Sequence, residues 1–187
     1  MYNTLIKTMY FNCEENGMKN IVLIGMPSSG KTTIGKPLSK KMGMGFIDTD
    51  KLILDREKKA LRDIVIEDGL DKFLNIQETT VLDLNVENHV ISTGGSIVYN
   101  TKAMEHLKKY GLIVYLQLGI DELEKRISGK RRFAKNKEQS FSDIYNERTP
   151  LYEKYAHVIV DCGGKGIDTI VNEIGAIYKN KVKREMV

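Results

Sequence analysis

The sequence predicts an α/β fold of three layers (α/β/α), with helices on both faces of a five-stranded parallel sheet. Two observations favour this fold. Short apolar runs recur along the chain, and helical patterns separate each run from the next. Parallel strands need such crossover connections, because each helix has to carry the chain back to the same end of the sheet. The five predicted strands cover residues 21–25, 45–47, 89–92, 112–118 and 157–160.

The connecting segments carry helix signals. Residues 31–42 follow a glycine-containing loop, and residues 121–127 begin with an acidic side chain, which is favourable at a helix N-terminus. Residues 51–57 follow two aspartates that could cap them. In residues 167–178, isoleucine and valine recur at helical spacing, so we expect one face of this helix to pack on the sheet.

The length of 187 residues fits one domain. We expect residues 18–180 to form this domain, residues 1–17 to be an N-terminal extension outside the fold, and residues 181–187 to be a C-terminal tail. The extension lacks the continuous apolar segment of a secretory signal, and no apolar run reaches the roughly 20 residues of a membrane span. We therefore expect a cytoplasmic protein that has no membrane partner.

The net charge of +4, from 29 basic and 25 acidic residues, suits anionic small molecules. It falls well short of the basic footprint typical of nucleic-acid binding, so we expect a small-molecule substrate and no nucleic-acid partner. Cys13 and Cys162 have neither CxxC spacing nor a nearby histidine pair, which argues against a thiolate metal site. We expect the protein to be a monomer.

Residues 25–32 match the pattern G-x-x-x-x-G-K-[ST] of the phosphate-binding P-loop, between a predicted strand and a predicted helix. Glycines let backbone N–H groups surround phosphates, and the following helix points its positive end at them. Lys31 would supply a full charge to the phosphates, and the Thr32 hydroxyl would bind Mg²⁺. We expect a nucleoside triphosphate to be bound by Gly25, Met26, Pro27, Ser28, Ser29, Gly30, Lys31, Thr32 and Thr33.

Two other predicted strands are also followed by residues suited to a site. Asp48 and Asp50 follow the second strand, and Gly94 and Gly95 follow the third. Ligands collect at the carboxyl ends of parallel strands, so we expect these residues to face the P-loop. Asp48 could hold Mg²⁺ and Asp50 could orient or deprotonate an acceptor hydroxyl. The alternative is that Asp48 or Asp50 caps the next helix, and one carboxylate can do both. The glycines would let a ligand approach the backbone, although a plain turn would also explain them.

Residues 128–140 are dense in positive charge and lack periodicity, which predicts a mobile surface loop. Charge runs of this kind are usually solvated. Next to a P-loop, however, such a loop can act as a lid that brings guanidinium groups to a transferring phosphoryl group. Four arginines lie in or near this loop or in the motif that follows it, namely Arg126, Arg131, Arg132 and Arg148.

The order of these motifs resembles the shikimate kinase family. The P-loop is followed by F-I-D-T-D, by T-G-G, by the basic segment and by E-R-x-P-L-Y-E-K-Y-A at residues 147–156. The resemblance covers about residues 18–177. It implies a P-loop kinase fold like that of nucleoside monophosphate kinases, with a five-stranded parallel sheet and a mobile lid at about residues 128–140. It also implies transfer of the ATP γ-phosphate to a hydroxyl of shikimate or a related hydroxy acid, in the aromatic amino-acid precursor pathway if the acceptor is shikimate.

The same resemblance implies roles for individual residues. Lys31 and Thr32 would serve ATP and Mg²⁺, and Asp48 would serve Mg²⁺. Asp50 would contact the acceptor diol, so that Lys31, Asp50 and the lid residue Arg132 would carry catalysis. The remaining implied contacts are those of Arg126 with adenine, of Gly94 and Gly95 with the acceptor, and of Arg148 with the acceptor's carboxylate.

The chain departs from the family's pattern at the acceptor site. The family usually has F-R-x-x-E after the second strand, and its arginine anchors the carboxylate, whereas residues 73–78 here read F-L-N-I-Q-E. Leu74 stands at the arginine position and cannot bind an anion. Arg62 and Lys72 are candidate replacements. The sequence leaves open a kinase with another acceptor, such as a polyol, a sugar acid or a hydroxy amino acid, and a nucleotide-binding regulator that has lost transfer.

Overall fold

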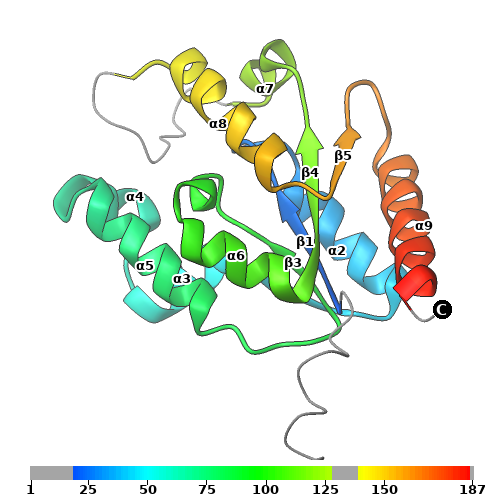
Figure 1. Cartoon of the computed structure of the whole chain (residues 1–187). Helices are drawn as coiled ribbons and strands as arrows, with labels where there is room; N and C mark the ends of the chain where they lie inside the picture. The colour runs from blue at the N-terminus through cyan, green and yellow to red at the C-terminus, as the bar shows by residue number, and fades with distance from the viewer. Residues whose placement is uncertain (1–18, 128–138, 186–187) are drawn as a thin grey trace, which may run out of the picture.

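The computed structural model describes residues 19–127 and 139–185 (Figure 1). The predicted extension, most of the predicted lid including Arg132, and residues 186–187 of the predicted tail lie outside these ranges. Within the described ranges, no helix combines the length and the hydrophobicity that crossing a bilayer requires.

The predicted strands form one parallel sheet in the order β2-β3-β1-β4-β5. They are β1 (Asn20–Ile24), β2 (Gly45–Asp48), β3 (His89–Ser92), β4 (Gly111–Gln117) and β5 (Val158–Asp161). The prediction of a five-stranded parallel sheet is confirmed, and no strand limit differs from the prediction by more than one residue. All residues of the central strand β1 are buried, as expected for a strand covered on both faces.

Helices cover both faces of the sheet, which confirms the three-layer prediction. On one side α2 and α9 pack together, and on the other α6 and α8 contact β4 (Figure 1). Helix α2 has the predicted limits, whereas α9 continues to Glu185, beyond the predicted domain end at residue 180. The helices are α2 (Lys31–Met42), α3 (Thr49–Glu57), α4 (Leu61–Glu67), α5 (Leu70–Leu82), η1 (Ile97–Tyr99), α6 (Thr101–Tyr110), α7 (Ile120–Arg126), α8 (Phe141–Tyr155) and α9 (Ile167–Glu185).

Strand β2 passes into α3 without a loop. Asp48 is the last residue of β2 and the N-cap of α3, where its Oδ1 atom accepts hydrogen bonds from the backbone N–H groups of Asp50 (3.1 Å) and Lys51 (3.3 Å). These bonds satisfy two of the N–H groups that have no partner within the helix. The prediction that Asp48 caps this helix is therefore confirmed, and the cap holds Asp50 in the first turn of α3.

A small apolar cluster holds α3, α4 and α5 together beside the main core. It consists of Ile53, Ile64 and Phe73, which are each at most 3% exposed. Lys59, just before α4, bridges Glu67 (2.9 Å) and Asp68 (2.6 Å) at the other end of that helix. Exposed ion pairs contribute little free energy, so burial of the apolar cluster is what holds α4 and α5 in place.

Candidate active site

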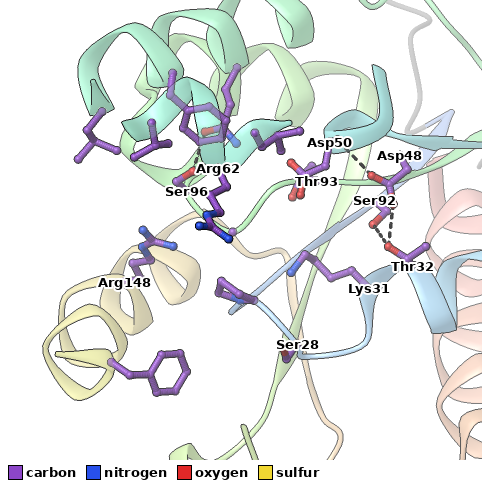
Figure 2. Close-up of a pocket in the computed structure, with 18 of the residues that line it drawn as sticks. Ser28, Lys31, Thr32, Asp48, Asp50, Arg62, Ser92, Thr93, Ser96 and Arg148 are labelled. Carbon is purple, nitrogen blue, oxygen red and sulfur yellow. Dashed lines mark hydrogen bonds between the residues drawn. The ribbon is translucent and has the colours of Figure 1, made fainter. Parts of the chain in front are cut away.

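A cavity of about 1470 Å³ opens at the carboxyl ends of the strands (Figure 2). Pockets for one small molecule usually measure roughly 300–1,000 Å³, so this cavity has room for two ligands. Its wall includes most of the predicted site residues, namely Pro27, Ser28, Gly30, Lys31, Thr32, Thr33, Asp48, Asp50, Gly95, Arg126 and Arg148. Four other predicted residues, Gly25, Met26, Ser29 and Gly94, do not line it, and Arg132 lies outside the described residues.

The P-loop has the backbone conformation that phosphate binding needs. Gly25, Ser28 and Gly30 all have positive φ angles, of 143°, 69° and 97°. A side chain at Gly25 would also lie 2.8 Å from the carbonyl oxygen of Leu116, so the position is closed to other residues. Left-handed residues next to right-handed ones in a loop can turn neighbouring N–H groups toward one point, which is an anion-binding arrangement.

Lys31 lies at the first turn of α2 and is only 8% exposed. Its Nζ atom donates hydrogen bonds to the carbonyl oxygens of Gly25 and Met26, both at 2.8 Å, and so crosses the P-loop. The ammonium group is thereby held at the wall of the cavity, where Figure 2 shows it. A positive charge fixed in a partly dry site attracts an anion more strongly than one in bulk water.

Thr32, Asp48 and Ser92 form a polar cluster beside the P-loop. The Thr32 hydroxyl donates to Asp48 Oδ2 (2.7 Å) and lies 3.3 Å from Ser92 Oγ (Figure 2). In the described part of the chain no three acidic, histidine or cysteine side chains gather as a metal site. A hydroxyl and one carboxylate nevertheless fit Mg²⁺, because this ion keeps several waters and binds phosphate oxygens besides one or two protein ligands.

Asp50 lies half-buried in the cavity wall, next to Gly94 and Gln77. A Cβ atom at Gly94 would stand 2.6 Å from Asp50 Oδ1 and would collide with Gln77 Nε2. Gly94 also donates its N–H to Thr49 Oγ1 (3.2 Å). The missing side chain at Gly94 therefore makes room for the Asp50 carboxylate, whereas Gly95 borders the cavity itself.

Arg148 of α8 lines the cavity although it is only 1% exposed. Its Nε atom donates to Tyr99 Oη (3.1 Å), and the guanidinium carbon lies 5.0 Å from the centre of the Tyr99 ring. Burial raises the pKa of Tyr99, and the nearby Arg148 charge opposes this shift. Tyr99 therefore stays a neutral phenol at physiological pH and orients the arginine.

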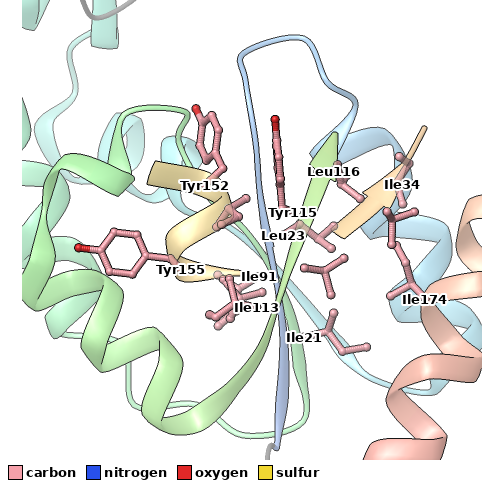
Figure 3. Packing of buried hydrophobic residues seen from close by; sticks show 14 of the residues in the cluster. Ile21, Leu23, Ile34, Ile91, Ile113, Tyr115, Leu116, Tyr152, Tyr155 and Ile174 are labelled. Atoms are coloured by element: carbon pink, nitrogen blue, oxygen red, sulfur yellow. The ribbon is translucent and has the colours of Figure 1, made fainter. Parts of the chain in front are cut away.

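Tyr152 of the same helix braces the loop after β3. Its hydroxyl donates to the carbonyl oxygen of Gly95 (2.5 Å), and its ring stacks on Tyr115 with the centroids 5.1 Å apart (Figure 3). Burial raises the pKa of both phenols, to about 12 for Tyr115. Because a Cβ at Gly95 would lie 2.8 Å from the ring of Pro27, this position tolerates only glycine without rearrangement.

Arg126 is the last residue of α7 and lines the cavity on the P-loop side. Its Nη1 atom lies 3.9 Å from the position of a Cβ built on Gly30. Its ion pair with Glu122 is long, at 3.7 Å, and half-exposed, so it restrains the guanidinium only weakly. The side chain can therefore turn toward a nucleotide bound at the P-loop.

Apart from Arg62, the sequence did not predict the residues that α4 and α5 contribute to the cavity wall. Leu61, Val65 and Phe73 supply apolar lining, and Gln77, which is 2% exposed, accepts a hydrogen bond from Ser96 Oγ (2.7 Å). Phe73 and Gln77 are four residues apart and so lie on the same face of a helix, which was the signal in the sequence that both could line one wall. Leu74 does not line the cavity and packs against the cluster that joins α3, α4 and α5.

One cavity is lined by the P-loop, by the Asp50 carboxylate and by the buried guanidinium of Arg148. Phosphoryl transfer needs this combination, because the donor and the acceptor hydroxyl have to meet in line. The protein is a phosphotransferase that acts on an alcohol group.

Comparison with known proteins identifies the particular family. A family model described as shikimate kinase matches residues 27–179. A shikimate kinase from Clostridium botulinum (strain ATCC 19397 / Type A) is 39% identical over 88% of this chain and 99% of its own length. The chain belongs to the shikimate kinase family, as the resemblance predicted.

Solved structures agree with this assignment. A shikimate kinase from Acinetobacter baumannii, solved in complex with shikimate, superposes with a TM-score of 0.78 at 25% identity and covers 89% of this chain and 96% of its own. Shikimate kinase from Aquifex aeolicus gives a TM-score of 0.76 at 28% identity, over 87% and 98% of the two chains.

Proposed function

We propose that this protein transfers the γ-phosphoryl group of ATP to a hydroxyl of shikimate. The observation that carries the proposal is Arg148, a nearly fully buried arginine in the wall of the cavity, which Figure 2 draws on the other side of the cavity from Asp50. A guanidinium binds a carboxylate through two parallel hydrogen bonds, so Arg148 suits an acceptor that carries both a carboxylate and hydroxyls. The relatives in the family, which are shikimate kinases, support the same acceptor.

The proposed mechanism assigns the described residues to two groups. Lys31 and the P-loop N–H groups bind the β- and γ-phosphates, with Arg126 beside the adenine. Asp50 orients the acceptor hydroxyl and accepts its proton, since its carboxylate borders the same cavity. Arg132 of the predicted lid would neutralise charge on the phosphoryl group during transfer.

Mg²⁺ belongs to this proposal through Thr32 and Asp48. The ion would neutralise charge on the phosphates. The Thr32 hydroxyl, which now donates to Asp48, would turn its oxygen toward the ion, while Asp48 continues to cap α3 through its other oxygen. Ser92, which pairs in register with Asp48 in the sheet, lies beside Thr32 in the same polar cluster.

The relatives give no support to another acceptor or to a regulator without transfer. They are shikimate kinases, and this chain matches 99% and 96% of the length of two of them. Lys31, Thr32, Asp48 and Asp50 all border the cavity, as a working kinase needs.

Asp48→Asn is expected to raise the Mg²⁺ concentration needed for half-maximal activity about tenfold. Asparagine caps helices as well as aspartate does, so α3 keeps its N-terminus while the site loses a negative charge. Titrating activity with Mg²⁺ at fixed ATP measures the effect, and thermal unfolding checks that the cap is kept. An unchanged Mg²⁺ requirement would remove Asp48 from metal binding.

A coupled assay of ADP release tests the proposed function. Shikimate is offered over a wide concentration range beside quinate, gluconate, homoserine and no acceptor, with ATP and Mg²⁺ present. We expect saturable turnover with shikimate, and only the rate without acceptor for gluconate and homoserine. ATP binding without shikimate-dependent turnover would overturn the proposal.

A further inference from the structure

No other residue of α5 replaces the arginine that the family has at the position of Leu74. Leu74 packs in the apolar cluster, and Gln77, one turn later, is a neutral amide that Ser96 already engages. Lys72 does not line the cavity, its side chain is 60% exposed, and its Nζ atom donates to Asp68 (3.3 Å). Helix α5 therefore brings no positive charge to the acceptor side of the cavity.

Helix α4, in contrast, brings a positive charge to this side of the cavity, that of Arg62. Arg62, Val65 and Ile66 follow the spacing of one helical face, and all three line the cavity. Figure 2 shows the Arg62 side chain reaching from α4 into the cavity, on the side where Arg148 also points inward. Ile64, 1% exposed, anchors the same helix in the apolar cluster, so the base of Arg62 is fixed.

The Arg62 guanidinium is also available to bind an anion in the cavity. Within residues 19–127 and 139–185 it is engaged in no ion pair or hydrogen bond, although three acidic residues, Asp63, Glu67 and Asp68, lie nearby in the chain. Lys59 holds two of these, Glu67 and Asp68. An arginine that projects beside apolar side chains into a cavity, toward a second arginine, forms a site for a planar anion.

We propose that Arg62 is the second arginine for the acceptor's carboxylate, reaching from α4 and acting with Arg148 of α8. The inference rests on the proposed function and names the group that makes shikimate binding possible without an arginine on α5. Val65, Ile66 and Phe73 form the apolar surface against which the acceptor's ring lies, and they keep water away from the carboxylate. Arg62 thus determines acceptor specificity and does not touch the phosphoryl group.

The test compares Arg62→Met with Lys72→Met. Both changes remove one exposed positive charge from the α4–α5 wall, but only Arg62 lines the cavity. We expect Arg62→Met to raise the KM for shikimate about 10- to 100-fold, the effect of losing a charge-assisted bidentate contact. The KM for ATP should change less than about twofold, kcat should change less than the KM for shikimate, and Lys72→Met should resemble the unchanged protein.

A second measurement separates a direct contact from a general effect. Calorimetry gives the affinities of the unchanged protein and of Arg62→Met for shikimate and for its methyl ester, which has no negative charge. If Arg62 binds the carboxylate, the preference for the acid over the ester shrinks at least about fivefold in Arg62→Met. An undiminished preference would overturn the inference even if the KM had risen.

The outcomes distinguish this inference from the proposed function. If the unchanged protein phosphorylates shikimate and Arg62→Met behaves like Lys72→Met, Arg62 is not the anchor, whereas the function stands. If the unchanged protein neither binds nor phosphorylates shikimate, the proposed function fails and the inference fails with it. Thermal unfolding of Arg62→Met should match that of the unchanged protein, because the side chain is exposed and has no hydrogen bond or ion pair within residues 19–127 and 139–185.

Discussion

Lys31→Ala is expected to lower kcat about a thousandfold or more and to weaken ATP binding about tenfold. The ammonium group is the only full positive charge that the P-loop itself carries at residues 25–32, and it is held at the cavity wall by two carbonyl oxygens. Charge that builds up on the phosphoryl group during transfer would lose this partner. Steady-state kinetics with saturating shikimate and a direct ATP-binding measurement separate the two effects.

Lys36→Ala is the matched control for Lys31→Ala. Lys36 lies on the same helix, but its side chain is exposed and outside the cavity wall. It should leave both kcat and ATP affinity unchanged, because only a charge at the phosphates acts on transfer. Near-normal turnover in Lys31→Ala would overturn the assignment of the P-loop as the nucleotide site.

Asp50→Asn is expected to lower kcat by about two to four orders of magnitude, with ATP affinity changed less than about threefold. Asparagine has almost the shape of aspartate and fits the space beside Gly94, but it cannot accept the proton of the acceptor hydroxyl. The backbone N–H of residue 50 still donates to Asp48, so α3 begins as before.

Asp55→Asn controls for the loss of a charge on α3. Asp55 is exposed and does not line the cavity, so its substitution should leave kcat unchanged. If Asp50→Asn retained full kcat with shikimate, Asp50 would have no part in proton transfer. A shift confined to the KM for shikimate would instead limit Asp50 to binding the acceptor.

Local patterns were enough to predict the sheet and to place the P-loop at the end of its first strand, where it borders the cavity. Strands such as β1 and β4 are buried on both faces, so nearly all of their residues are apolar and each appears in the sequence as a continuous apolar run. The P-loop is contiguous, so its conformation follows from a few neighbouring residues such as Gly25 and Gly30. Asp48 could be assigned both to a cap and to a site, and the structure shows that it caps α3 and also lines the cavity.

The part of the cavity wall that α4 and α5 form could not be predicted in the same way, because it depends on how these two helices pack. Of Arg62 and Lys72, only Arg62 lines the cavity, and the two lie on different helices because the chain breaks at Gly69, between Asp68 and the start of α5. Across this break Lys72 still reaches Asp68, while Arg62 stays on the face that turns to the cavity. Gln77 and Ser96 likewise meet only in the folded chain, 19 positions apart.

The direct passage from β2 into α3 ties the chemistry to the pairing of the sheet. Asp48 is the last residue of β2 and lies opposite Ser92 of β3 in the sheet. Asp50 follows two residues later, and no loop lies in between to absorb a displacement. A slip of β2 by one residue would turn its side chains to the opposite face of the sheet. Both carboxylates would then leave the cavity together, so a chain with a misaligned edge strand would be inactive, however well its P-loop had formed.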